Sequence, residues 1–579
     1  MKLLRLKITD PNRFRSLQAG FEHHFRTEWA LQQDDGFASF VCAGPNGSGK
    51  SNLLEALAAI FFQLEVLRVR RSFLPESFLF DEEDNPHGFK NGDGSPNGFE
   101  LEYLIRVPDE FRNSGSPEFA KVKIIKEIGQ SPQLTWLNQA DFKSDNPDAI
   151  SERERDFLLP EYVLGYSSGE NEILSLPFFK MRFIQFDEYW HALKNQLSYP
   201  GRPESRLAYL DSGFSQAILL CNLLFQDDDT LKPFRKDVGI EKLKEFRIII
   251  KRSIEVSAEV AEGFGTDNQA LSRDAETGTY RVNLMKPLEA DKSSADNFDP
   301  IVTRLKRCAT CFFDDESTDT LYLDYFVDEV TKEAFRENFD QSPVVLFQAL
   351  QVLLTLNLYS VSDTLKSDLY HSDSLYVTET VPTLASDQRI MRIKNFWIRK
   401  TDTETPVLLK SLSDGEHQLL HSLGLCLLFK NTNSLFLLDE PETHFNPDWR
   451  SNFVTRLHQC FKGSDDSHEM LVTTHTPFLI SDSKPDKVLV FKKADGVVTV
   501  TTPEYNTLGA SINKITMNTF GKRETIGGHA QKILEDLRKR FEDGEDKEKL
   551  IEEINRKLGD SVEKVLLIKS IMDSMEEQD

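Results

Sequence analysis

The sequence predicts an α/β protein, and three short apolar runs carry that prediction. The runs are residues 37–43, 435–438 and 471–474. Each has the length and composition of a buried strand, and each stops at a glycine-rich or polar segment. About 360 residues separate the segment after the first run from a polar motif that precedes the second run. We therefore expect an α/β core whose two halves flank a large insertion.

The first run leads into Gly44–Ser51, which fits the pattern of a phosphate-binding loop. Its glycines let backbone N–H groups turn toward phosphate oxygens. Helical periodicity follows from Ser51 to Phe61, so a helix N-terminus points at the same anion. Lys50 is expected to reach the β- and γ-phosphates, and the Ser51 hydroxyl to bind Mg²⁺. The residues predicted to bind the nucleotide here are Gly44, Pro45, Asn46, Gly47, Ser48, Gly49, Lys50, Ser51 and Asn52.

The second and third runs end in residues suited to catalysis. Asp439 and Glu440 follow the second run, and a carboxylate pair at the tip of a core strand is costly to bury without a cation or a reacting proton nearby. Asp439 suits a Mg²⁺ ligand, and Glu440 suits a general base that activates water. An ordinary turn at Pro441 is the alternative. His475 follows the third run, where an imidazole can hydrogen-bond the γ-phosphate or the attacking water.

A fourth motif, Leu-Ser-Asp-Gly-Glu at residues 412–416, precedes an apolar helix predicted from Glu416 to Phe429. Ser413 and Glu416 have the spacing of a capping box, so the plain interpretation is a helix start. The same capped N-terminus offers N–H groups and a hydroxyl to an anion. Ser413 and Gly415 are therefore candidate ligands of a phosphate group.

Together the four motifs resemble the ATP-binding-cassette (ABC) class of P-loop NTPases, closest to the soluble SMC-like and OLD-like ATPases. The resemblance covers residues 1–65 and 385–505. It implies ATP and Mg²⁺ as cofactors and a homodimer or higher oligomer, in which Ser413 and Gly415 bind the γ-phosphate held by the opposite subunit. Asp414 replaces the usual glycine. Its extra carboxylate should weaken ATP-driven closure or make closure more Mg²⁺-dependent.

Further segments resemble the ATPase subunit of nuclease-partnered bacterial defence systems of the Septu type. They are residues 3–6 with 14–17, 441–447 and 474–477. This resemblance implies a sensor or regulatory subunit of an anti-phage complex that controls a separate nuclease. A nuclease of HNH type is one candidate for that partner. An SMC-like clamp for DNA repair or chromosome maintenance is the alternative. A transporter subunit is disfavoured by the large insertion and by the lack of a clear glutamine loop. Gln185 is more consistent with an ordinary strand residue.

Composition limits the remaining possibilities. The net charge of −25 argues against broad nucleic-acid binding by the chain alone, although basic clusters at residues 68–71 and in a helix predicted over 242–252 leave contact through a complex open. No sequence suited to a membrane span or signal peptide is found, which predicts a cytoplasmic protein. The six cysteines show no disulfide framework, and Cys308 and Cys311 lack the partners of a zinc site.

Four regions are expected along the chain. Residues 1–200 form the first half of the ATPase lobe, with a β-rich segment extending its sheet, and residues 201–380 form a compact, mainly helical insertion. Residues 381–505 form the second half of the lobe, and 506–579 a charged helical tail. The 104 residues after His475 show no nuclease motif, so cutting activity is expected in a partner. An apolar stripe on the last helix suits either a cap on its own domain or a protein dock.

Overall fold

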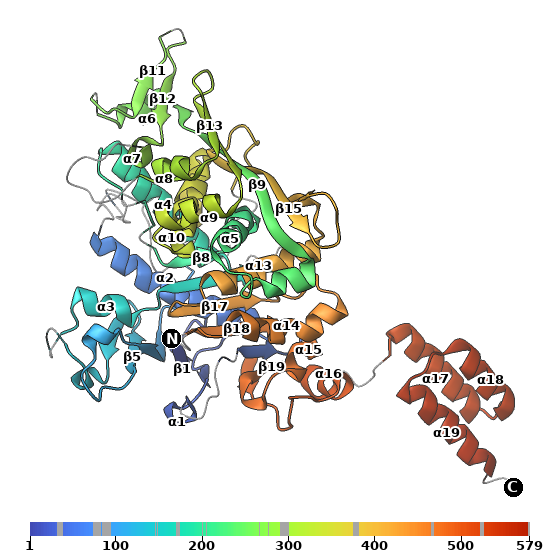
Figure 1. The fold of residues 1–579 in the computed structure, drawn as a ribbon. Helices are drawn as coiled ribbons and strands as arrows, with labels where there is room; N and C mark the ends of the chain where they lie inside the picture. The colour runs from blue at the N-terminus through green and yellow to red at the C-terminus, as the bar shows by residue number, and fades with distance from the viewer. Residues whose placement is uncertain are drawn as a thin grey trace.

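The computed structural model describes the chain except for residues 32–36, 38, 73–82, 84–93, 145, 147–148, 169–173, 200, 204, 266, 276, 290–299, 374–380, 465–467, 522–525 and 577–579. Figure 1 shows an α/β body with the last three helices set apart from it. The predicted α/β class is confirmed, with a P-loop core whose two halves flank a large insertion.

A seven-stranded sheet forms the centre of the body, in the order β20-β19-β3-β18-β17-β7-β8. All neighbouring pairs are parallel except β19 with β20. Every residue of β3, β17 and β18 is buried, which explains their continuous apolar sequences. The strands are β3 (Phe40–Ala43), β7 (Tyr162–Ser167), β8 (Leu207–Tyr209), β17 (Ser434–Asp439), β18 (Glu469–Thr474), β19 (Val488–Ala494) and β20 (Val497–Thr501).

The two helices predicted beside these strands are present. The helix after the phosphate-binding loop is α2, which contacts β7, β17 and β18. The helix of the fourth motif is α13, and it packs against α5 and α14. With these two, the helices of this part of the body include α1 (Glu28–Leu31), α2 (Lys50–Ser72), α5 (Ser212–Phe225), α13 (Asp414–Leu428), α14 (Pro447–Cys460), α15 (Pro477–Ser481) and α16 (Ile512–Phe520).

The β-rich segment near the N-terminus forms a sheet of its own. Its order is β2-β1-β4-β5-β6, all antiparallel, so the expectation that it extends the central sheet was wrong. The two sheets share one apolar core, and Glu469 of β18 accepts a hydrogen bond from the backbone of Leu3 at 2.7 Å. The elements are β1 (Lys2–Ile8), β2 (Glu22–His24), β4 (Phe99–Arg106), β5 (Phe119–Lys126), β6 (Gln133–Trp136) and the neighbouring α3 (Glu152–Leu158).

The insertion contains helices but also two antiparallel sheets, which the sequence analysis missed. One has the order β13-β14-β9-β15-β16 and the other β10-β12-β11. The strands are β9 (Ile240–Lys251), β10 (Ser253–Val256), β11 (Leu271–Arg273), β12 (Tyr280–Asn283), β13 (Cys311–Asp315), β14 (Thr320–Phe326), β15 (Met391–Lys400) and β16 (Val407–Leu408). The helices of the insertion include α6 (Ala258–Glu262), α7 (Lys286–Glu289), α8 (Ile301–Cys308), α9 (Glu329–Asn338), α10 (Pro343–Thr355) and α11 (Asp363–His371). The helix α4 (Leu176–Lys194), from the part assigned to the first half of the lobe, packs against α7, α10 and α11.

The helix predicted over residues 242–252 is strand β9. Its buried residues Ile240, Leu243 and Phe246 are three apart, which imitates helical spacing. Register shifts in the pairing of β9 with β15 account for this break in strict alternation. The β-branched run Ile248–Ile250 favours a strand, and it is buried between β14 and β15. Because β15 and β16 come from residues assigned to the second half of the lobe, the insertion is joined to that half by a continuous sheet.

The charged tail forms the three predicted helices, α17 (Gly528–Glu542), α18 (Lys547–Lys557) and α19 (Val562–Glu576). They pack around a small apolar core of their own, apart from the core of the body (Figure 1). The stripe on α19 is divided: Ile571 is buried in the bundle, whereas Val565 and Leu566 are more than half exposed. Both predicted roles of this stripe stay predictions.

Among the described residues, one segment, Pro343–Ser360, is long and apolar enough to cross a membrane by length and composition. It comprises α10 and the short 3₁₀ turn that follows, and 56% of it is buried inside the protein. α10 packs on α5 and α4, as expected of a core helix.

Candidate functional site

All four sequence motifs lie around one edge of the central sheet, where its parallel strands end. We name it the nucleotide edge, after the predicted nucleotide-binding loop that lies there. β3, β18 and β17 are neighbours, and they end at Ala43, Thr474 and Asp439. Since the three strands are parallel, their carboxyl ends meet at one edge of the sheet. This topology places the phosphate-binding loop, the carboxylate pair and His475 side by side. Open α/β sheets bind ligands at this kind of edge.

The phosphate-binding loop needs its glycines for two separate reasons. Gly44, Gly47 and Gly49 all have positive φ, at 147°, 71° and 102°, where side chains are disfavoured. Two of them also lie against other atoms. A Cβ at Gly44 would come within 2.4 Å of the Phe491 carbonyl oxygen, and one at Gly49 within 2.8 Å of the Ser16 hydroxyl.

Lys50 and Ser48 give the loop the chemistry of an anion site. Lys50 is 5% exposed, and its ammonium group donates to the carbonyl oxygens of Gly44 and Pro45 at 3.0 and 3.1 Å. Burial lowers its pKa, and the nearby carboxylates of Glu440 and Asp439 oppose that change. The Ser48 hydroxyl is buried without a hydrogen-bond partner among the described residues. A buried ammonium and an unsatisfied hydroxyl both fit a phosphate ligand.

Asn52 differs from the other predicted ligands. Its side-chain oxygen accepts a hydrogen bond from the Ser16 hydroxyl at 2.6 Å, and its amide nitrogen donates to Glu55 at 3.3 Å. Glu55 in turn accepts from Arg15 at 2.9 Å. In this structure Asn52 therefore ties α2 to the loop over residues 13–17, a contact that the sequence analysis did not anticipate.

The two predicted Mg²⁺ ligands touch each other. The Ser51 hydroxyl donates to Asp439 Oδ1 at 2.8 Å, and Thr473 donates to the same oxygen at 2.6 Å. Asp439 is 2% exposed. Burial raises its pKa, and the two hydroxyl donors act in the opposite direction. A hydroxyl and a buried carboxylate joined in this way are oxygen ligands of the kind that Mg²⁺ prefers, so the residues fit this ion.

Glu440 and His475 form a second pair of side chains at this site, next to Ser51 and Asp439. His475 Nε2 lies 3.1 Å from Glu440 Oε1, with each side chain about one-third exposed. This hydrogen bond is the main reason why the pKa of Glu440 is lowered, so its carboxylate stays ionised. Glu440 has φ of 49°, a strained conformation for a residue with a side chain. Its N–H donates to the Thr473 hydroxyl at 3.0 Å, which helps to hold that conformation.

The fourth motif begins α13 as the capping box predicted from the sequence. The Glu416 N–H donates to the Ser413 hydroxyl at 3.3 Å, and the Ser413 N–H donates to the Glu416 carboxylate at 2.8 Å. Lys400 binds the other oxygen of Glu416 at 2.8 Å. Among the described residues the Ser413 hydroxyl bonds only within this box, so it makes no contact with the phosphate-binding loop of its own chain.

Gly415 and Gln418 of α13 connect this helix to the loop after Glu440. The Gln418 side-chain oxygen accepts from the His444 N–H at 2.7 Å. A Cβ at Gly415 would lie 2.8 Å from the His444 carbonyl oxygen. The start of α13 and the loop after Glu440 therefore pack backbone against backbone, and the lack of a side chain at Gly415 permits this close contact.

Replacing Gly415 with alanine tests that packing. Alanine favours a helix over glycine by about 1 kcal/mol, but the new methyl group would meet a backbone oxygen that cannot move freely. We expect the clash to dominate and the free energy of unfolding to fall by roughly 1–3 kcal/mol, measured by urea denaturation. Gly528→Ala is the matched control, because nothing lies within 4 Å of its Cβ position at the start of α17. Equal effects of the two changes would contradict the close approach.

Three further residues, Thr473, Ser168 and Glu442, lie around Glu440 and His475, and sequence reasoning gave no individual role to any of them. Thr473 was visible only as part of an apolar run. Ser168, at the end of β7, donates through its hydroxyl to the Glu440 carbonyl oxygen and lies 2.8 Å from the Thr443 hydroxyl. The sequence over residues 161–169 predicts a strand that ends in a serine- and glycine-rich turn able to approach the nucleotide. Ser168 of this turn contacts the loop after Glu440, whereas Gly169 lies outside the described residues. Glu442, 4% exposed, accepts a hydrogen bond from Thr474, the residue before His475.

The buried Glu442 carboxyl gives a testable pH dependence. Burial raises its pKa from 4.5 to about 7, so the folded protein binds this proton more tightly than the unfolded chain. Its contribution to stability is present at low pH and is lost as pH rises through 7. We expect Glu442→Gln to be more stable than the wild type at pH 8, with an advantage that shrinks by about 2–3 kcal/mol at pH 5. Urea denaturation at both pH values measures this, and a difference independent of pH would contradict it.

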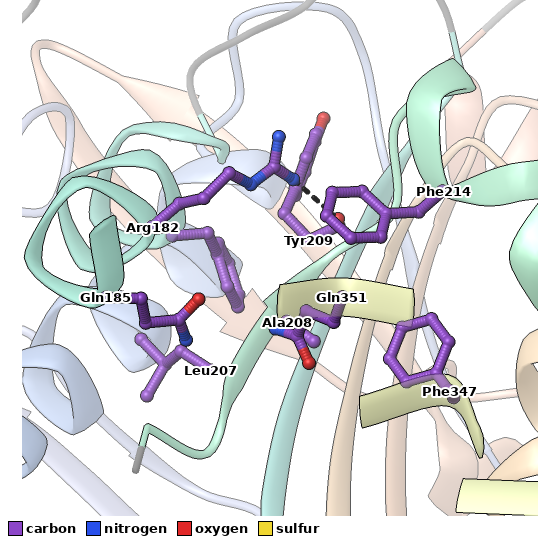
Figure 2. Close-up of a pocket in the computed structure, with 9 residues that line it drawn as sticks. Arg182, Gln185, Leu207, Ala208, Tyr209, Phe214, Phe347 and Gln351 are labelled. Carbon is purple, nitrogen blue, oxygen red and sulfur yellow. Dashed lines mark hydrogen bonds between the residues drawn. The ribbon is translucent and has the colours of Figure 1, made fainter. Parts of the chain in front are cut away.

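Gln185 is not at this site. It lies in helix α4 rather than in a strand, and with Phe178 and Arg182 it lines a small pocket between α4, β8 and α10 (Figure 2). The Arg182 guanidinium lies 4.5 Å from the Phe179 ring and donates to the Tyr209 carbonyl oxygen at 3.0 Å. Gln185 therefore takes part in helix–sheet packing, and the interpretation as a strand residue was wrong.

The two cysteines of the isolated pair lie in different environments. Cys308 is buried in α8, and Cys311 is exposed on β13; both are free thiols. Burial raises the pKa of the Cys308 thiol to about 12.

Comparisons with known proteins agree with the ATPase core. The protein family described as "AAA domain, putative AbiEii toxin, Type IV TA system" matches residues 303–481, which include the fourth motif, the carboxylate pair and His475. No curated protein sequence matches this chain. The geometry and the family match together support an ATPase core of the P-loop type.

Solved structures with some likeness include two SMC heads. The SMC head domain from Thermotoga maritima has 12% sequence identity and a TM-score of 0.27, over 87% of this chain and 100% of that one. The Smc head domain bound to the C-terminal domain of ScpA, from Pyrococcus furiosus, has 14% identity and a TM-score of 0.30, over 93% and 99%. With TM-scores below 0.5, neither match bears on the function of this chain.

Proposed function

We propose that the protein is a Mg²⁺-dependent ATPase whose active site is completed by a second copy of the chain. The observation that carries this proposal is the position of Ser413. It caps a helix whose N-terminus can bind an anion, yet its hydroxyl makes no contact with the phosphate-binding loop of its own chain. In a head-to-tail pair, Ser413 and Gly415 of one subunit would face the γ-phosphate held by Lys50 of the other.

The residues present support a simple division of labour. The phosphate-binding loop and Lys50 hold the phosphates, and Ser51 and Asp439 hold Mg²⁺, which would neutralise charge on them. Glu440 accepts a proton from the attacking water. His475, hydrogen-bonded to Glu440 at 3.1 Å, keeps the base in position, and Thr473 holds Asp439 and Glu440 in one arrangement.

We further propose that this ATPase is the sensor or regulatory subunit of a cytoplasmic anti-phage complex and controls a separate nuclease. The family matched at residues 303–481 is described as a putative AbiEii toxin of a Type IV TA system, which favours a defence role. The insertion folds as packed helices and sheets over its described residues, an arrangement unlike a coiled-coil arm. The alternative, an SMC-like DNA clamp, shares the same ATPase chemistry.

One experiment separates these two functions. The chain is co-expressed with the product of the adjacent gene, and the purified complex is assayed for DNA or RNA cleavage with and without ATP. Cleavage that depends on ATP, and that Lys50→Ala alters, supports the sensor. Retention of circular but not linear DNA on the Glu440→Gln protein, without cleavage, supports the clamp and contradicts the sensor.

A further inference from the structure

A second polar pocket, of about 280 Å³, lies at the opposite edge of the central sheet. Its wall includes Tyr162, where β7 begins, and Ser205 and Arg206, which come just before β8. Arg68, near the end of α2, closes another side. Because β7 and β8 are parallel, their starts lie far from the nucleotide edge. This pocket is therefore distinct from the site described above.

Three arginines line this pocket, and two of them are fixed by carboxylates. The Glu65 carboxylate accepts a hydrogen bond from Arg68 Nη2 at 2.6 Å. The Asp156 carboxylate accepts one from Arg206 Nη2 at 3.1 Å, and the Asp156 carbonyl oxygen accepts another from Arg206 Nη1 at 2.7 Å. Glu65 also accepts from the Arg206 N–H at 3.1 Å. Because these contacts orient the guanidinium groups in advance, less ordering is needed when a ligand binds.

Arg202 is the third arginine, and it differs from the other two. It is exposed, and no hydrogen bond or ion pair to it is found within the described part of the chain. Asp156 and Glu161 also line the pocket, and with Glu65 beside Arg68 the carboxylates equal the three guanidinium groups in number. Within the described residues Arg202 is therefore the guanidinium group of this pocket that has no direct carboxylate partner, in a chain whose net charge is −25.

Two hydroxyl groups add neutral donors. The Tyr162 oxygen accepts from Gln348 Nε2 at 2.6 Å, and the Ser205 oxygen accepts from the Leu207 N–H at 3.1 Å. Since each hydroxyl oxygen is already an acceptor, each O–H remains suited to donate. Guanidinium groups and hydroxyls that share one pocket match the oxygens of a phosphate group.

We propose that this pocket binds a phosphate monoester, with Arg202 as the main charged contact. The phosphate can come from a free nucleotide or from the 5′ end of a nucleic-acid strand. Arg68 lies 18 residues after Lys50 on α2, a distance of about 27 Å along one helix. A ligand here would therefore contact the far end of the helix that starts at the ATP site. Binding itself is independent of the proposed ATPase function, whereas any effect on ATP turnover rests on it.

Calorimetric titration of the full-length Lys50→Ala protein, in which the ATP site is weakened, tests the proposal. The probes are AMP and adenosine in one arm, and a short single-stranded DNA with a 5′-phosphate or a 5′-hydroxyl in the other. We expect saturable binding of at least one phosphorylated probe and at least about tenfold weaker binding of its unphosphorylated partner. AMP binding identifies a nucleotide as the source, and binding of the phosphorylated DNA alone identifies a strand end.

Substitutions in the same Lys50→Ala background locate the site. Arg202→Glu should weaken binding by more than about tenfold. Arg153→Glu is the matched control: Arg153 is a 73% exposed arginine on α3, outside the pocket, and its reversal should leave the affinity unchanged. The proposal is overturned if no phosphorylated probe binds, if the phosphate makes no difference, or if both reversals have the same effect. A circular dichroism spectrum confirms that each variant is folded.

Discussion

Glu440→Gln is expected to lower the rate of ATP hydrolysis by about 10²- to 10⁴-fold, the usual contribution of a general base. ATP binding should change little, because the phosphate contacts belong to Lys50 and the loop and the Mg²⁺ ligands are Ser51 and Asp439. Glutamine has the size of glutamate and leaves the backbone contact with Thr473 intact. Only the proton-accepting group is lost. We therefore expect the variant to accumulate as an ATP-bound, closed head-to-tail pair.

Radiolabelled ATP hydrolysis, filter binding and light scattering measure these three quantities on the same sample. Asp448→Asn is the matched control, since it removes an exposed carboxylate at the start of α14, in the segment that follows the same loop. It should leave turnover close to that of the wild type. Undiminished turnover in Glu440→Gln would remove Glu440 from the role of base, and equal loss in both variants would indicate a general effect of charge.

The active-site motifs could be predicted because their chemistry is local. A glycine-rich loop between a strand and a helix, or two carboxylates at a strand end, requires only adjacent residues, and these elements lie where the sequence places them. The capping box at Ser413 is equally local and was confirmed. The contacts that Thr473 and Ser168 make with Glu440 could not be predicted, because they depend on which strands are neighbours. Nothing in the sequence around Ser168 indicates that β7 pairs with β17.

The strands of the insertion could not be predicted for the same reason. β9 pairs with β14 through Ile250 and Leu321, and with β15 through Ile250 and Met391. Each pairing partner is distant in sequence, and the register shifts with β15 hide the alternation that would reveal a strand. Local spacing alone therefore favoured a helix, and tertiary pairing overrode it.

The composite nature of the site leads to the second large effect. Ser413→Arg is expected to leave the nucleotide affinity of an isolated subunit nearly unchanged, since the Ser413 hydroxyl bonds only within its capping box in its own chain. Hydrolysis should be blocked, because a long cation at the helix start obstructs the close approach that γ-phosphate binding requires. Lys50→Ala should also be inactive, but through lost phosphate binding. The two variants thus damage opposite faces of the same interface.

Mixing the two inactive proteins is the decisive measurement. In a head-to-tail heterodimer, one composite site carries both lesions and the other carries neither, so an equimolar mixture with free exchange should recover up to about one quarter of wild-type turnover if the sites act independently. Subunit exchange is verified by fluorescence transfer between labelled proteins, and each variant mixed only with itself is the control. An inactive mixture whose subunits exchange would contradict independent composite sites. A fully active Ser413→Arg protein would reduce the motif to a helix cap, because the γ-phosphate could not then depend on that helix start.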